Sequence, residues 1–191
     1  MKLLKFVLNL SILGYVAYAV TIAISGQVAD PVQYLLHTTG LTALKLLLLT
    51  VAIGPIAKWL NKPGLNMCRK MLGLYTFAIA GMHLLTYLTF DLQYQWAETF
   101  QAIIYRPYIT LGFLSFVLLT LLALSSFDWA KKRLNKYWKR IHNGVYVIIV
   151  LCLLHFSWSQ KTIWDEALYY WLTGLVLLYL KMKPQLTNAK R

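Results

Sequence analysis

The sequence is poor in charge, and above all in acidic residues. Only 13% of its 191 residues are charged and only six are Asp or Glu, whereas 59% are hydrophobic and the mean hydropathy is +0.57. A soluble domain usually has about 25% charged residues. This scarcity excludes a soluble globular domain and indicates an integral membrane protein.

Cysteine and nucleotide-binding motifs are also scarce or missing. The two cysteines, Cys68 in a loop and Cys152 within an apolar run, lie at different depths, and neither belongs to a CxxC pair, so no disulfide or zinc site is implied. No GxGxxG loop follows a strand-like run. We therefore expect residues 1–191 to form a single membrane domain that does not bind a nicotinamide dinucleotide through its own fold.

Long apolar runs are present, and they do not alternate with polar residues as the strands of a membrane β-barrel would. Six windows of roughly 17 to 20 residues have almost no charge, and this length suits a helix that crosses a bilayer core of about 30 Å. They lie near residues 6–24, 41–57, 71–90, 108–127, 141–160 and 166–181. The predicted fold is an all-α bundle of six transmembrane helices.

The basic residues predict the orientation of this bundle. Sixteen of the nineteen fall on one side if both termini are cytoplasmic, as basic loops usually are. These are Lys2, Lys5, Lys58, Lys62, Arg69, Lys70, Lys131, Lys132, Arg133, Lys136, Lys139, Arg140, Lys181, Lys183, Lys190 and Arg191. On the far side lie Arg106, Lys161 and all acids except Asp128. Anionic lipid then accounts for the net charge of +13, and no nucleic-acid partner is needed.

The first apolar window, which follows Lys2 and Lys5, resembles a signal peptide. Its apolar run is long enough to span a membrane, and its removal would leave five helices and an N-terminus on the far side. We expect it to be retained as a span.

Two histidines lie within apolar windows, where such groups are rare unless they have a function. His83 lies about 18 Å and His155 about 21 Å from the cytoplasmic ends of their windows, so both reach nearly one level of the outer leaflet. One imidazole from each of two helices is the ligand set of a b-type heme. Alternatively, each ring simply bonds a neighbouring helix, for example through Thr86 or Ser157.

His142 lies about 20 Å nearer the cytoplasm than His155. It could serve a second, inner heme, but Arg69 occupies the position where the partner ligand would be expected. Alternatively, His142 lines a flavin or heme site with Trp138 and Arg140, or it is an interfacial histidine among basic residues.

Three further residues are candidates for contacts with heme propionates. His37 precedes the second window on the outer side, Lys45 is the one basic residue inside a window, and Arg106 lies at the outer start of the fourth window. A charge at membrane depth needs a partner, and a propionate would suffice. Arg106 could instead contact lipid headgroups, and Lys45 could bond a carbonyl or snorkel.

Four runs carry a resemblance to a known family. They are DPVQYLLHTTGLTALKLLLLTVAIGPIAKWL, RKMLGLYTFAIAGMHLLTYLTFD, YRPYITLG and KRIHNGVYVIIVLCLLHFSWS. The region from about residue 29 to 180 resembles the MsrQ (YedZ) family of heme-binding membrane subunits, in the ferric-reductase-like transmembrane superfamily. The resemblance implies b-type heme and FMN, and matches His83, His142 and His155 to the functional histidines. Arg69 departs from the pattern of the oxidase relatives and puts a second heme in doubt.

The resemblance also implies a path for electrons. A cytoplasmic flavin reductase would supply them, this subunit would carry them across the bacterial inner membrane, and MsrP, a periplasmic molybdopterin enzyme, would repair oxidised methionines in envelope proteins. A quinone-linked cytochrome b is the main alternative. A small transporter is disfavoured, because such proteins usually place carboxylates within their spans, and here all six acids fall in loops or at helix ends. The outer segment 91–107 has near-helical spacing of apolar residues and predicts an interfacial helix that lies on lipid or docks a partner.

Overall fold

A computed structural model describes residues 2–160 and 166–188, with side chains up to residue 181. Lys161, Asp165, Lys190 and Arg191, which entered the charge analysis, lie outside the described residues. Throughout the described ranges the chain is helical, without a strand. The prediction of an all-α fold is confirmed.

Five described helical segments are long and apolar enough to cross a membrane. They are α1 (Lys2–Ile24), α2 (Pro31–Trp59), the segment Pro63–Asp91 that contains α3 (Arg69–Thr86), α5 (Pro107–Ser125), and the segment Asp128–Ser159 that contains α8 (Val145–Ser159). The sixth predicted window forms α9 (Glu166–Asn188), which packs along α2 and α8. The chain is thus a multi-pass membrane protein.

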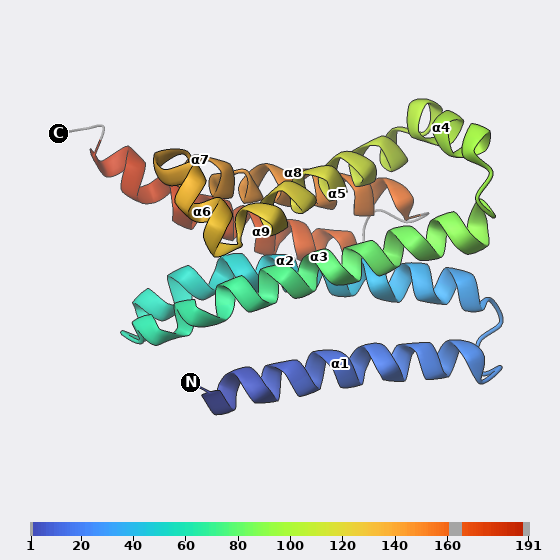
Figure 1. The fold of residues 1–191 in the computed structure, drawn as a ribbon, viewed down its shortest axis with the longest axis horizontal. Helices are drawn as coiled ribbons and strands as arrows, with labels where there is room; N and C mark the ends of the chain where they lie inside the picture. Colours follow the sequence, from blue (N-terminus) through green and yellow to red (C-terminus); the bar gives the residue numbers. More distant parts are fainter. Residues whose placement is uncertain (1, 161–165, 189–191) are drawn as a thin grey trace.

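The helices run up and down, so that consecutive helix ends alternate between the two ends of the bundle (Figure 1). Short elements complete the turns: a 3₁₀ segment η1 (Pro63–Cys68), a π-helical segment η2 (Tyr87–Asp91), α4 (Trp96–Tyr105), α6 (Asp128–Leu134), a 3₁₀ segment η3 (Asn135–Tyr137) and α7 (Trp138–Asn143). The most extensive packing joins α2 to α3 and α5 to α8. The bundle therefore contains two helical hairpins that lie against each other.

The second helix is longer than the window 41–57 indicated. It begins at Pro31, because the Asp30 side chain caps it by accepting a hydrogen bond from the Gln33 amide at 2.9 Å, and because proline suits the first helical position. His37 therefore lies inside α2, and its expected position just before the helix was wrong. Asp30 and Pro31 are a sequence signal for this start.

The window 141–160 is not one straight helix. α7 ends at Asn143 and α8 begins at Val145, and the Gly144 amide bonds the Ile141 carbonyl at 2.9 Å in a tighter turn between them. Counting 100° per residue from His142 to His155 on an ideal helix is therefore not valid. The break separates α7, at the end of the bundle, from the membrane helix α8.

Two apolar clusters hold the bundle together. The larger one joins α2, α5, α8 and α9 around the fully buried Ile148, Ile149 and Leu153. The smaller one joins α1, α2 and α3 around Leu72 and Ile79. Because lipid is as apolar as these side chains, close packing stabilises the bundle more than removal from water does.

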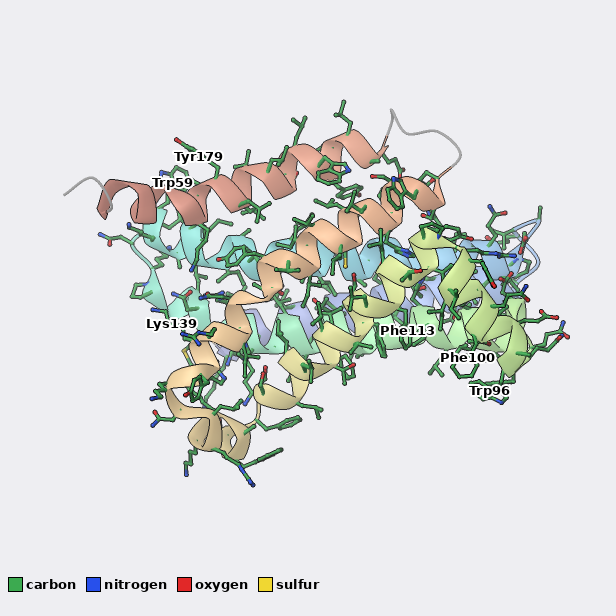
Figure 2. All side chains as sticks on the ribbon, turned by 90° about the horizontal axis from the view of Figure 1, so that it is seen from above. Trp59, Trp96, Phe100, Phe113, Lys139 and Tyr179 are labelled. Atoms are coloured by element: carbon green, nitrogen blue, oxygen red, sulfur yellow. The ribbon has the colours of Figure 1, made fainter. Side chains whose placement is uncertain are left out.

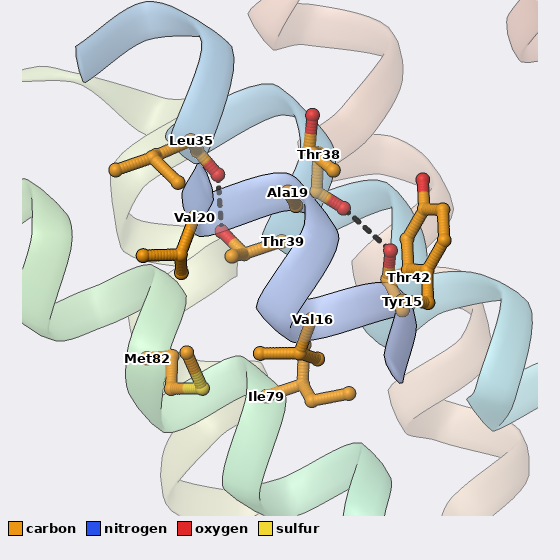
Figure 3. Close-up of a pocket in the computed structure, with 10 residues that line it drawn as sticks. All are labelled: Tyr15, Val16, Ala19, Val20, Leu35, Thr38, Thr39, Thr42, Ile79 and Met82. Carbon is orange, nitrogen blue, oxygen red and sulfur yellow. Dashed lines mark hydrogen bonds between the residues drawn. The ribbon is translucent and has the colours of Figure 1, made fainter. Parts of the chain in front are cut away.

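A small cavity remains between α1, α2 and α3 (Figure 3). Its volume is about 10 Å³, close to the space of one water molecule and far below that of a cofactor. The hydroxyls of Thr39 and Thr42, at its edge, bond carbonyls four residues earlier in α2, at 2.6 Å each. Both hydroxyls donate within α2, and the Thr39 oxygen also lies 3.4 Å from Nδ1 of His83 in α3. The cavity itself is left apolar.

Charged and aromatic side chains mark the two ends of the bundle. Trp59, Tyr179 and Lys139 lie at one end, and Trp96 and Phe100 at the other (Figure 2). Among described side chains, the basic residues near helix ends lie where α1 begins and α9 ends, with Arg106 as the exception. Aromatic belts and one-sided basic charge are typical of membrane-spanning bundles.

The outer helix α4 confirms the prediction of a helix within residues 91–107. Its Thr99 and Ala102 are buried, and it packs against α5. Trp96, Phe100 and Ile104 are exposed on the outside. This arrangement suits a helix at the membrane surface.

Substitutions at Leu72 and Leu85, the most buried and the most exposed leucine of α3, test how this helix packs. Leu72→Ala should lower the free energy of unfolding by about 2–5 kcal/mol, because Leu72 is fully buried (0% exposed) and its removal leaves a cavity. Leu85→Ala, at a side chain that is 57% exposed, should change it by about 0.5 kcal/mol or less. Unfolding of the detergent-solubilised protein in denaturant measures both. Equal losses would contradict the described position of α3.

Candidate functional site

Two imidazole rings face each other between the hairpins. His83 comes from α3 and His155 from α8, 72 positions apart in the sequence. Their ring centroids are 6.2 Å apart, and the ring planes are nearly perpendicular, at 82°. The structure therefore brings together the two histidines that the sequence singled out.

Each ring is oriented by one backbone carbonyl of its own hairpin. The Nδ1 atom of His83 lies 2.9 Å from the Leu36 carbonyl oxygen in α2, and Nδ1 of His155 lies 2.7 Å from the Tyr108 carbonyl oxygen in α5. The Thr39 hydroxyl of α2 is a second, longer partner of the His83 Nδ1 atom, at 3.4 Å. A carbonyl oxygen accepts only, so each Nδ1 carries the proton and donates it. Neither Nε2 atom has a hydrogen-bond partner among the described residues. In the neutral form of each ring, Nε2 is therefore the unprotonated nitrogen.

This arrangement meets the requirements of a metal between the rings. A metal–nitrogen bond is about 2.0–2.1 Å long, so two such bonds, extended to the ring centres, separate the centroids by about 6 Å. Metal-binding histidines usually donate the other ring N–H to a carbonyl or carboxylate, as here. The described residues hold no group of three or more His, Cys, Asp or Glu side chains for a bare ion. Two imidazoles do suffice for a heme iron, because the porphyrin supplies four nitrogens.

A buried hydroxyl without a partner lies one turn beyond His83. Tyr87 begins the π-helical segment η2, and its hydroxyl oxygen is buried but forms no hydrogen bond with any described residue. Leaving such a group unpaired costs about 1–3 kcal/mol. The Arg106 side chain lies near this hydroxyl without forming a hydrogen bond of good geometry. Two polar groups therefore lie close together at the α4 end of the histidine pair.

The three candidates for propionate contacts occupy different places. Arg106 lies between α4 and α5, two residues before the carbonyl that binds His155. The imidazole of His37 lies 3.8 Å from the Glu166 carboxylate, at the start of α9. Lys45 is exposed midway along α2, nearly opposite Leu36 at about 100° per residue, so it faces away from the histidine pair.

The inner candidates are only partly brought together. His142 stacks on Trp138, with 4.2 Å between ring centroids, and its Nε2 lies 3.1 Å from the buried Ser125 hydroxyl. The Trp138 indole N–H donates to the Ser125 carbonyl at 3.0 Å. Ser125 thus organises this cluster and already occupies the His142 nitrogen that an iron would need.

The remaining inner candidates are basic. Arg69 begins α3 at the same end of the bundle, and Lys131 lies 5.0 Å from the centre of the Trp138 ring. Arg140 is exposed and forms no ion pair or hydrogen bond with a described side chain. The inner end is a positively charged, aromatic surface without a second imidazole pair.

Fold and site together define a multi-pass helical membrane protein whose interior presents two imidazoles to each other. The family model "Ferric reductase like transmembrane component" matches residues 39–153, a range that contains α3 and ends two residues before His155. The chain belongs to this family and, within it, to the group formed by the MsrQ proteins.

Curated relatives support the narrower assignment. The protein-methionine-sulfoxide reductase heme-binding subunit MsrQ of Yersinia pseudotuberculosis (serotype O:1b) is 38% identical over 172 residues, which are 90% of this chain and 85% of the relative. The protein of the same name from Yersinia pestis (strain Pestoides F) is 38% identical over 172 residues, 90% of this chain and 84% of the relative.

Sequence reasoning missed several parts of the site. The carbonyls of Leu36 and Tyr108 are backbone groups, so the residue type at these positions does not indicate that they accept the histidine protons. Ser125 and Tyr87 are common polar residues at helix ends, and only the packing reveals that one organises His142 and the other has a buried hydroxyl without a partner.

Removal of the orphaned hydroxyl tests its environment. Tyr87→Phe should not destabilise protein produced without heme, and should raise its free energy of unfolding by up to about 1–3 kcal/mol, because a buried unpaired donor is lost. Thermal unfolding of Tyr87→Phe and wild type, produced with and without heme supply, measures this. Tyr179→Phe, at an exposed hydroxyl, is the control. A marked loss of stability in heme-free Tyr87→Phe would mean that the hydroxyl has a protein partner after all.

Proposed function

We propose that this chain binds a b-type heme between His83 and His155 and passes single electrons through it. The observation that carries the proposal is the pair of rings at 6.2 Å, each held through Nδ1 and each with an unprotonated Nε2. The relatives, whose name describes a heme-binding subunit, support it.

Heme iron supplies reversible one-electron chemistry. The two imidazoles would fill both axial positions, leave no open position for oxygen or substrate, and favour electron transfer over catalysis at the iron. The Leu36 and Tyr108 carbonyls hold the ring tautomers, and the apolar packing around α3 and α8 excludes water. Arg106 and the Tyr87 hydroxyl, both on the outer side of the pair, suit the heme propionates better than the outward-facing Lys45 does.

The basic end of the bundle supports a cytoplasmic location for that end and, with α9 as the sixth span, cytoplasmic termini in a bacterial inner membrane. The histidine pair then lies toward the periplasm. This position suits delivery to a periplasmic methionine sulfoxide reductase, the molybdopterin enzyme MsrP, with a cytoplasmic flavin reductase as donor. The relatives, which are heme-binding subunits of a protein-methionine-sulfoxide reductase, support the link to methionine sulfoxide reduction.

A heme near the periplasm leaves a gap to a cytoplasmic donor. We propose that the surface formed by Trp138, His142, Arg69 and Arg140 holds the carrier that bridges it. Positive charge there favours a phosphate group, and the stacked Trp138 and His142 rings provide a flat aromatic face, so FMN fits better than a second heme. The bond from His142 to Ser125 supports the same choice, because a heme would have to break it.

Three matched substitutions test the heme assignment. His83→Ala and His155→Ala should each lose most of the heme per polypeptide and the electron flow that depends on it. His37→Ala should keep both, because His37 contacts Glu166 and neither imidazole. Heme quantified per polypeptide, with visible spectra, measures the first effect. Normal heme in both of the first two variants would refute the ligand assignment.

The angle between the rings gives a spectroscopic prediction. Nearly perpendicular imidazoles leave two iron d orbitals close in energy, so oxidised wild-type protein should show a strongly anisotropic low-spin ferric signal in electron paramagnetic resonance. The rhombic signal of parallel rings would contradict the 82° geometry.

The inner surface has its own test. His142→Ala should keep the heme of the outer pair but slow its reduction by a cytoplasmic flavin reductase at least tenfold, whereas dithionite should still reduce it fully. Lys139→Ala, a neighbouring exposed residue of α7, should leave the rate nearly unchanged. Stopped-flow reduction in membrane vesicles measures both rates. An unchanged rate in His142→Ala, with no flavin in the purified wild type, would rule out this surface.

A further inference from the structure

Each histidine of the pair packs against a glycine of its own hairpin. A methyl group added at Gly40 in α2 would lie 3.0 Å from Nδ1 and Cε1 of His83. One added at Gly112 in α5 would lie 2.8 Å from the same two atoms of His155. Real β-carbons essentially never lie closer than 3.0 Å to a neighbouring atom, so alanine at position 112 requires the His155 ring to move. Alanine at position 40 would place its β-carbon at this limit, so the His83 ring would have to shift by a few tenths of an ångström.

The glycines lie beside the carbonyls that orient the rings. Gly40 is four residues after Leu36, and Gly112 is four residues after Tyr108, so each shares a helix face with its carbonyl. The side chain of a helical residue covers the turn that precedes it. A β-carbon at either glycine would therefore cover the carbonyl that accepts the Nδ1 proton.

The same spacing occurs in both hairpins. Each histidine follows its carbonyl residue by 47 positions and its glycine by 43. The connections differ, however: η1 joins α2 to α3, whereas α6, η3 and α7 join α5 to α8. The two hairpins keep the same spacing between glycine, carbonyl and histidine although different segments join their helices. This indicates that the three groups act together.

The low helix propensity of glycine indicates that Gly40 and Gly112 occupy their helical positions for a reason. Glycine inside a helix costs about 0.5–1 kcal/mol relative to alanine, so it needs a packing reason. Two other helical glycines provide the contrast. An added methyl group at Gly73 or Gly81 would meet its nearest neighbour at an ordinary 3.8 or 3.9 Å.

We propose that Gly40 and Gly112 are positioning residues for the two axial histidines: they leave the carbonyls of Leu36 and Tyr108 open to Nδ1, and thereby fix the direction of each Nε2 toward the shared iron. The proposal rests on the heme function proposed above. Bonding to a carbonyl makes an imidazole a stronger electron donor to its metal. The glycines thus influence the reduction potential as well as the geometry.

Alanine substitutions at four glycines test the proposal. Gly112→Ala should give the largest effect and Gly40→Ala a smaller one: less heme per polypeptide, a changed low-spin ferric signal, and a higher midpoint potential in the heme that remains. Gly73→Ala and Gly81→Ala should match wild type in all three and be equally or more stable. Wild-type signals and potentials in both Gly40→Ala and Gly112→Ala would overturn the proposal. If Gly40→Ala and Gly112→Ala kept wild-type signals and potentials while His83→Ala and His155→Ala lost heme, the proposed heme function would hold and the positioning role of the glycines would be refuted.

A second measurement keeps the test decisive if Gly112→Ala does not fold. His155→Gly removes the ring that would clash, and added imidazole should take its place and restore the low-spin spectrum. In the double variant His155→Gly with Gly112→Ala, imidazole should bind about tenfold more weakly, because the covered Tyr108 carbonyl no longer accepts its N–H. His155→Gly with Gly81→Ala should bind it as the single variant does. Equal affinities in all three proteins would refute the positioning role.

Discussion

The bonds from two ring nitrogens to backbone carbonyls are the constraint on which the site depends. An imidazole at membrane depth has two nitrogens to satisfy, and hydrocarbon offers no partner for either. Each ring of the pair gives its Nδ1 proton to a carbonyl of the neighbouring helix, at 2.9 Å for His83 and 2.7 Å for His155. The second nitrogen of each ring is left without a partner among the described residues, and the ring of the other hairpin lies 6.2 Å away, centroid to centroid. A metal shared between the two rings satisfies both remaining nitrogens at once.

Two hairpins with different outer surroundings provide this arrangement. α1 packs on the α2–α3 hairpin, whereas α9 packs on α8 and α2, and α4 and α6 pack on α5. The stacked rings of Phe77 and Phe116, 5.6 Å apart, pack α3 against α5. This aromatic contact joins the two hairpins that carry the histidine rings, whose centroids are 6.2 Å apart. The geometry of the site therefore depends on packing well away from the imidazoles.

Sequence patterns predicted the helical membrane fold and the histidine pair, because apolar length and intramembrane histidines are strong local signals. The start of α2 was misplaced by ten residues, since hydropathy does not register the capping by Asp30 and Pro31. The one-residue interruption at Gly144, within the segment that contains the fifth window, was not predicted, because only the backbone shows it. Lys45 was expected near a propionate, but a hydropathy window gives depth and not direction, and the side chain faces outward. The carbonyl partners were beyond sequence reasoning, because every residue has one.

The contrast between the outer and inner histidines bears on how electrons would cross the membrane. His83 and His155 each keep one nitrogen uncommitted, whereas His142 stacks on Trp138 and its Nε2 lies at hydrogen-bond distance from Ser125. An inner heme would need to break that bond and would find Arg69 where a second imidazole is required. A flavin needs neither change, because its phosphate gains from the basic residues and its rings gain from an aromatic face. The difference in hydrogen bonding therefore supports the proposed flavin site at His142 over a second heme there.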